Sequence, residues 1–153
     1  MNKRLLTASL ALMLGAGYSL TASAQARPAT LVKWRQAAMT LQGKYFYPRL
    51  RPMFQGKIPY DANTAARDAE FLLALSKMPW DGFAPSTKDI KSGTLPVAYT
   101  DTAKFKEAQD LLQSEVSKLV VLTKSGDEAA VKAQIGAVDK ACGSCHESFR
   151  EKD

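Results

Sequence analysis

The sequence has very little histidine and cysteine: its 153 residues include one histidine and two cysteines, and all three lie between positions 142 and 146. A structural zinc site takes four nitrogen or sulfur ligands, so three ligands crowded into one turn do not complete one. The sequence also shows no nucleophile paired with a general base and no phosphate-binding glycine loop. An enzyme built on such sites is therefore not expected.

Long apolar runs and basic runs are lacking as well. Beyond residue 24 no apolar stretch is long enough to span a bilayer, so we expect no membrane-spanning segment there. No run of lysine and arginine with interleaved aromatics occurs, so nucleic acid is not an expected partner. The 21 basic and 15 acidic residues leave a net charge of +6. This surplus fits either an evenly solvated surface or attraction to an acidic redox partner.

The first 24 residues are organised like a cleavable secretory signal. Lys3 and Arg4 form a short basic start, an apolar stretch runs from Leu5 to Leu14, and Ala22-Ser23-Ala24 is a cleavage site of the A-x-A type. The apolar stretch is too short for a spanning helix, and an uncleaved anchor is the alternative. We therefore expect export to the periplasm, with residues 25–153 forming one domain.

Residues 142–146 read Cys-Gly-Ser-Cys-His, the spacing of covalent haem attachment. On a helix, positions i, i+3 and i+4 share a face, so Cys142, Cys145 and His146 point the same way. Two such thiols can each bond a vinyl group of one haem, and the imidazole can bind the iron axially. The alternative is a disulfide or redox pair beside an idle histidine, but no strand precedes the motif as in thioredoxin-like sites. One covalently attached haem c is the prediction.

Hydrophobic spacing and capping residues predict four helices. Asp61, Asp101 and Asp127 are acidic N-caps at which the second, third and fourth helices begin. The fourth helix has the most regular pattern, with steps of four and three residues from Val131 to Phe149. Both cysteines lie in this seam, so an attached haem would replace part of the core. We predict an all-α protein, an antiparallel four-helix bundle with the haem near the C-terminus.

The first helix is expected to run from Pro28 to about Tyr47. Pro48 and Pro52 should end or kink it, and residues 48–60 are expected to form a loop. The apolar positions at helical spacing, which predict its buried face, are Leu31, Trp34, Ala38, Leu41 and Tyr45.

The second helix should end at Met78, before Pro79. Residues 79–100 contain several prolines and glycines and fit no period, which indicates a long crossover between the second and third helices. Trp80 and Phe83 are expected to attach this crossover to the body of the domain.

Four segments carry a resemblance to a known family: Lys33-Trp34-Arg35-Gln36-Ala37-Ala38-Met39, Gly56-Lys57-Ile58-Pro59-Tyr60-Asp61, Met78-Pro79-Trp80-Asp81-Gly82-Phe83-Ala84-Pro85 and Cys142-Gly143-Ser144-Cys145-His146-Glu147-Ser148-Phe149-Arg150. With these segments the chain resembles the class II c-type cytochromes, and most of all cytochrome c′, over nearly the whole mature chain. The resemblance implies a helical bundle that encloses one haem c.

The sixth position of the iron decides between two functions. With no second histidine, a bis-histidine haem is excluded, and Met39, Met53 and Met78 are the thioether candidates of the mature chain. By the resemblance, Met39 stands where the family places a residue over the distal haem face. In cytochrome c′ that residue leaves the iron five-coordinate, able to bind nitric oxide or carbon monoxide and to carry electrons. In low-spin relatives a methionine there binds the iron, and the protein acts purely in electron transfer.

The resemblance places further residues in the haem pocket. Arg150, four residues after His146, is expected against the proximal side, with a solvated arginine as the alternative. Arg35, one turn before Met39, is expected to pair with a haem propionate, with a plain surface arginine as the alternative. Phe149 is expected to pack against the haem.

The resemblance also implies a homodimer formed through the first two helices, with Trp34 in the core or in that interface. The redox partner is not identified by the sequence. Peroxidase chemistry needs a distal acid–base residue, and the single histidine is already used on the proximal side, so no enzymatic activity is expected.

Overall fold

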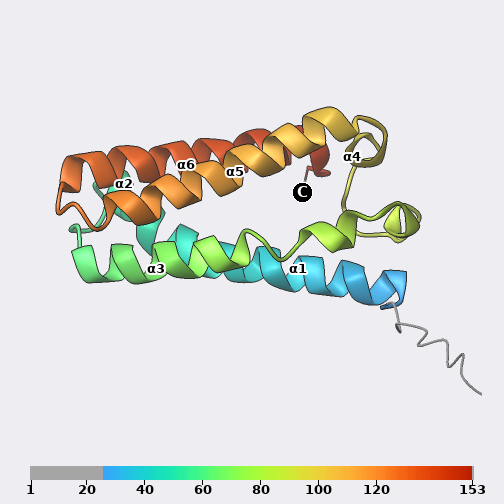
Figure 1. Ribbon diagram of the computed structural model, residues 1–153, viewed down its shortest axis with the longest axis horizontal. Coiled ribbons are helices and arrows are strands. Elements are labelled where there is room, and N and C mark those ends of the chain that lie inside the picture. Colours follow the sequence, from blue (N-terminus) through green and yellow to red (C-terminus); the bar gives the residue numbers. More distant parts are fainter. Residues whose placement is uncertain (1–25, 153) are drawn as a thin grey trace, which may run out of the picture.

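The computed structural model describes residues 26–152, and the predicted secretory signal lies outside these residues. Four long helices run antiparallel along the molecule (Figure 1), with α1 and α3 side by side in one layer and α5 and α6 in the other. The predicted four-helix bundle is confirmed. The long helices are α1 (Pro28–Tyr45), α3 (Ala62–Leu75), α5 (Thr102–Leu122) and α6 (Glu128–Phe149).

Aspartate side chains begin three of these helices, as predicted. Asp61, Asp101 and Asp127 each accept a hydrogen bond from the backbone N–H three residues later, at 2.5, 3.2 and 3.0 Å respectively. Each carboxylate satisfies one of the first-turn N–H groups that have no partner within the helix. The starts of α3, α5 and α6 therefore follow from local sequence alone.

The chain stays helical past the predicted end of the first helix. A π-helical turn, Phe46–Leu50, follows α1 and leads into the short helix α2, Arg51–Phe54. A π-turn spans five residues per hydrogen bond, and we attribute the survival of the helix at Pro48 to this wider turn, because proline lacks an N–H and crowds an ordinary α-helix. Pro52 lies in the first turn of α2, a position that proline tolerates. The loop expected over residues 48–60 is thus wrong for its first part.

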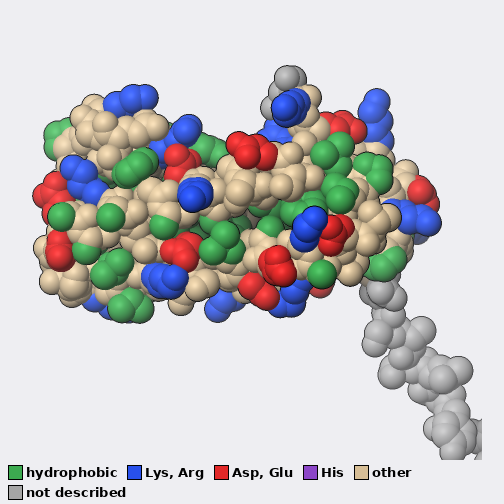
Figure 2. Space-filling view, turned by 90° about the horizontal axis from the view of Figure 1, so that it is seen from above, with side chains coloured by type: hydrophobic (Ala, Val, Ile, Leu, Met, Phe, Trp, Pro, Cys, Tyr) green, Lys and Arg blue, Asp and Glu red, His purple; other side chains and the backbone are tan. Residues whose placement is uncertain are grey.

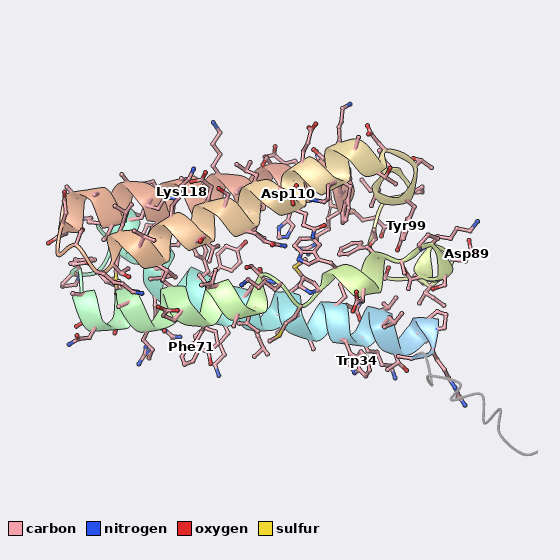
Figure 3. The ribbon with its side chains drawn as sticks, viewed as in Figure 1. Trp34, Phe71, Asp89, Tyr99, Asp110 and Lys118 are labelled. Carbon is pink, nitrogen blue, oxygen red and sulfur yellow. The ribbon has the colours of Figure 1, made fainter. Side chains whose placement is uncertain are left out.

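The buried face of α1 also differs from the predicted one. Trp34 and Leu41 are 58% and 41% exposed, whereas Arg35 and Gln42 are only 3% and 9% exposed. Figure 3 shows Trp34 at the outer edge of the molecule. The buried side of α1 faces a cavity and the crossover, which accept polar side chains, so apolar spacing identified the wrong face in part.

The crossover over residues 79–100 is confirmed, and short turns give it structure. Phe105 of α5 contacts one turn of it: its ring centroid is 6.1 Å from that of Trp80 and 4.7 Å from that of Phe83. Trp80 and Phe83 therefore attach the crossover to the bundle as predicted. Its turns are the 3-10 segments Trp80–Phe83 and Pro85–Thr87 and the one-turn helix α4, Val97–Thr100.

The short helix α2 lies over one half of the bundle (Figure 1), and its Met53 is part of the apolar core there. Small residues bring the helices close there: a Cβ atom placed on Gly136 of α6 would lie 2.7 Å from the ring of Phe54 in α2. Arg51 Nε of α2 also donates to the carboxylate of Asp139 in α6 at 3.0 Å. The core of this half consists of Leu50, Met53, Ala65, Ala69, Leu119, Val131 and Ile135.

The surface carries charges of both signs. Figure 2 shows lysine, arginine and acidic side chains interspersed over one face rather than gathered by sign. Among residues 26–152, no helix is both long enough and apolar enough to cross a membrane.

Candidate functional site

The motif side chains on α6 line a cavity of about 600 Å³. Cys142, Cys145 and His146 are half-buried on its wall. The wall opposite α6 is formed by α1. In the bundle α1 packs on α3 and the crossover, whereas α6 packs on α5. The volume falls within the range of cofactor sites in proteins.

Every residue that the sequence assigned to the haem pocket lies on this cavity. The members come from the first helix and from the last helix with the residue after it, more than 100 positions apart in the chain, so only the fold brings them together. Their roles toward a haem stay predictions, but their position in one cavity is observed. They are Arg35, Met39, Cys142, Cys145, His146, Phe149 and Arg150.

The environment of the two thiols does not favour a redox pair. Burial raises the pKa of Cys142 to about 12, with smaller contributions from the charges of Asp139 and Cys145. Burial also raises the pKa of Cys145. Redox-active cysteines have lowered pKa values, and these two are not joined by a disulfide. Within residues 26–152, no group of three or more His, Cys, Asp and Glu side chains could hold a metal ion by itself.

The surroundings of His146 favour its neutral imidazole. Burial lowers its pKa, and the nearby positive charge of Arg150 lowers it further. Neutral imidazole is the ligating form, because its ring nitrogen must offer a free lone pair. Arg150 lies on the cavity wall, and its backbone N–H donates to the carbonyl oxygen of His146 at 3.1 Å.

Backbone pairing encloses the cavity beside His146. The N–H of Leu95 donates to the carbonyl oxygen of Phe149, and the N–H of Glu151 donates to that of Gly93, both at 2.9 Å. The end of the crossover is thereby tied to the end of α6, directly after the motif. Nothing in the sequence indicated this pairing, because the two segments are more than 50 residues apart.

One methionine lies at the cavity. Among the methionines of residues 26–152, only Met39 lines it, whereas Met53 belongs to the apolar core and Met78 is 59% exposed. Gln42 Nε2 donates to Met39 Sδ at 3.8 Å and to the carbonyl oxygen of Leu75 at 3.4 Å. Gln42 was not predicted, because a glutamine in a helix normally faces solvent.

Arg35 shows the best fit to a negatively charged cofactor. It is buried, so the alternative of a plain surface arginine is wrong. Its Nη1 donates to the carbonyl oxygen of Gly82 at 2.5 Å, while its buried Nη2 has no hydrogen-bond partner among residues 26–152. A buried guanidinium without an anion is costly, and a haem carboxylate would supply one.

Aromatic side chains complete the walls of the cavity. Trp80 and Phe83 were predicted as anchors of the crossover, and they also line the cavity with Phe105. Tyr47 lies on the wall too, and its pKa is raised by burial first and then by the charge of Cys142. Tyr47 was missed as a pocket residue because it lies in the π-turn, which the sequence analysis did not predict.

Comparison with known proteins points to one family. The family described as Cytochrome C' matches residues 30–150. Cytochrome c′ of Rubrivivax gelatinosus is 40% identical over 128 residues, which cover 82% of this chain and 98% of that protein. Cytochrome c′ of Alcaligenes xylosoxydans xylosoxydans is 35% identical over 127 residues, covering 83% and 98%.

A solved structure from the second of these proteins extends the likeness to the fold. A nitric oxide complex of a cytochrome c prime mutant from Alcaligenes xylosoxidans has a TM-score of 0.76 and 35% identity, with 84% of this chain and 98% of that chain covered. A variant of the same protein was solved with carbon monoxide bound.

Proposed function

This chain belongs to the cytochrome c′ family, and from that membership we propose that it holds one haem c and binds nitric oxide or carbon monoxide at an open iron position. The family implies a covalently bound haem c. In this chain Cys142 and Cys145 would hold it through thioether bonds, and His146 would be the axial ligand. The observation that carries the proposal is the cavity that joins these side chains to the buried Arg35.

The residues of the cavity account for binding small uncharged gases. When bound, the haem supplies an iron position for the gas and a one-electron couple. Burial and Arg150 keep the His146 imidazole neutral. Much of the remaining wall is apolar, so it excludes water and favours ligands that need no hydrogen bonds. The apolar side chains of this wall include Phe46, Leu72, Leu112, Val116 and Val138.

The alternative function is a low-spin electron carrier in which Met39 is the sixth ligand. The position of Met39 on the cavity wall favours it. The hydrogen bond from Gln42 Nε2 to Met39 Sδ supports the open site instead, because it engages the sulfur within α1. Electron transfer to an unidentified redox partner is compatible with both.

The absorption spectrum of the purified protein, reduced with dithionite, tests these alternatives. We expect a broad visible band that sharpens when carbon monoxide is added. A sharp α band that ignores the gas would contradict the open site. Met39→Ala should then convert that spectrum to a high-spin one, while Met78→Leu, at an exposed position away from the cavity, should leave it unchanged.

We expect binding without enzymatic turnover, because the single histidine belongs to the haem motif. The predicted secretory signal supports a periplasmic location. Mass spectrometry of protein from the periplasmic fraction should find an N-terminus at Gln25; an intact signal on membrane-bound protein would contradict cleavage and export.

An exposed apolar face supports the proposed homodimer. Figure 3 shows Trp34 of α1 and Phe71 of α3 on the same outer edge of the molecule. Leu41 of α1 and Met78, in the turn after α3, are exposed too. A second copy would cover this face. Sedimentation should show a dimer that Trp34→Glu separates, with Val121→Glu on α5 as the control at another exposed apolar side chain.

A further inference from the structure

The guanidinium of Arg35 is held by the crossover rather than by its own helix. Nη1 carries two hydrogens; one is donated to the carbonyl oxygen of Gly82 at 2.5 Å and the other to the hydroxyl of Tyr99 at 3.3 Å. The guanidinium carbon also lies 4.3 Å from the centroid of the Phe83 ring. With both Nη1 hydrogens used, the buried Nη2 is the terminal nitrogen that has no hydrogen-bond partner among residues 26–152.

The hydroxyl of Tyr99 is itself held by a partly buried chain of hydrogen bonds. It lies 3.2 Å from the hydroxyl of Thr87, which in turn is 3.0 Å from the carbonyl oxygen of Gly82 and 2.8 Å from that of Ala84. One arrangement of protons satisfies every member: Tyr99 accepts from Arg35 and donates to Thr87, and Thr87 donates to a carbonyl. Such a partly buried network, in which both hydroxyls have their partners, restricts how its members can turn.

Tyr99 does not line the cavity, so its influence must pass through Arg35. Tyr99 belongs to α4, and Figure 3 shows it near the turns of the crossover. Close backbone approach keeps this arrangement in place: a Cβ atom on Gly82 would collide with Arg35 and lie 2.8 Å from the carbonyl oxygen of Leu31. The crossover is therefore seated against α1 at the point where the arginine leaves the helix.

We propose that Tyr99 is a positioning residue that orients Arg35 toward a carboxylate of the bound cofactor and thereby tunes the reduction potential of the haem. This inference rests on the proposed function. A guanidinium held beside the carboxylate neutralises its charge. When the guanidinium is less well held, more negative charge acts on the iron, which favours the ferric state and lowers the potential.

The test is a double-mutant cycle on the haem-loaded protein with the midpoint potential as its readout. Tyr99→Phe should lower the potential, and Arg35→Gln should lower it further. In the Arg35→Gln background, Tyr99→Phe should have no additional effect, because the residue through which it acts is gone. Tyr60→Phe is the control, since Tyr60 packs against the core and does not line the cavity.

An unchanged potential in Tyr99→Phe, or an equal shift in both backgrounds, would overturn the positioning role even if the melting temperature fell. If Tyr99→Phe fails to fold, Thr87→Val removes the partner of the Tyr99 hydroxyl and should lower the potential in the same direction. A wild-type protein that carries no covalent haem would overturn the proposed function and this inference together. A haem-loaded wild type with an unresponsive Tyr99→Phe would overturn this inference alone.

Discussion

The two halves of the bundle are built differently although α5 and α6 run through both. In the solid half, closed by α2, apolar side chains fill the space between helices directly, among them Ile135, Val131 and Leu119. In the hollow half, the cavity lies between α1 and α6, and the crossover and its aromatic rings form part of its wall. The comparison separates residues that hold the helices together from residues that hold a cofactor.

A single helix shows how little the sequence pattern changes between these halves. Along α6 the spacing of inward positions continues from Val131 and Ile135 to Cys142 and Cys145. The first pair is fully buried against other helices, and the second pair is half-buried on the cavity wall. The same seam thus serves packing at one end and attachment at the other.

The largest expected effect is in the hollow half. Replacing both Cys142 and Cys145 by serine removes the thiols that would form thioether bonds, so all covalent haem should be lost. Mass spectrometry of the denatured protein measures this, with Ser144→Ala as the control between them. Haem that stays on the denatured double variant would contradict the attachment.

A matched pair of valines on α6 compares the halves directly. Val131 and Val138 are both buried, but only Val138 lines the cavity. Val131→Ala should cost about 2 kcal/mol in the free energy of unfolding, from two buried carbons at about 0.8 kcal/mol each plus the void they leave. Val138→Ala should cost less, since it only widens an existing cavity, yet alter the haem absorption spectrum. Urea unfolding measures the stability of each variant, and absorption spectroscopy measures its haem. If the two variants changed both quantities equally, the two halves would not differ in the way described.

Two glycines test whether the crossover is seated as tightly as the hollow half requires. Gly82→Ala should destabilise the fold by about 1–3 kcal/mol, because its Cβ would collide with Arg35 and approach Leu31 O to 2.8 Å. Gly143→Ala, with nothing within 4 Å, should be neutral or stabilise α6 by up to about 1 kcal/mol. Thermal unfolding measures both. A harmless Gly82→Ala would mean that the crossover can move away.

The smallest effect concerns the start of α3 in the solid half. Hydrogen bonds with Thr64 lower the pKa of Asp61, so the folded state prefers the ionised carboxylate. The contribution of this carboxylate to the free energy of unfolding is complete above the ordinary pKa of an aspartate. It is lost as the pH falls through the lowered pKa of Asp61. Asp61→Asn keeps a capping side chain but does not titrate, so its stability should fall less on acidification. Parallel acid titrations of both proteins would refute this if they coincided.

The sequence predicted the bundle and the attachment motif because both depend on neighbouring residues. An N-cap aspartate meets an N–H three residues away, and Cys142 and His146 are one turn apart. The prediction failed at Pro48, where a π-turn carries the helix onward, and on the buried face of α1, where Leu41 is exposed while Arg35 and Gln42 are buried. Each failure depends on what lies around the segment rather than within it.

By itself, the sequence determined where α3, α5 and α6 begin and that two thiols and an imidazole share one face. The tertiary structure alone decided that Arg35 is buried with an unpartnered nitrogen, that Tyr99 and Gly82 hold it, and that a cavity lies opposite the motif. The physical reason is the distance along the chain over which each interaction acts. Helix hydrogen bonds and side-chain periodicity act within a few residues, whereas burial is set by segments that only folding brings together.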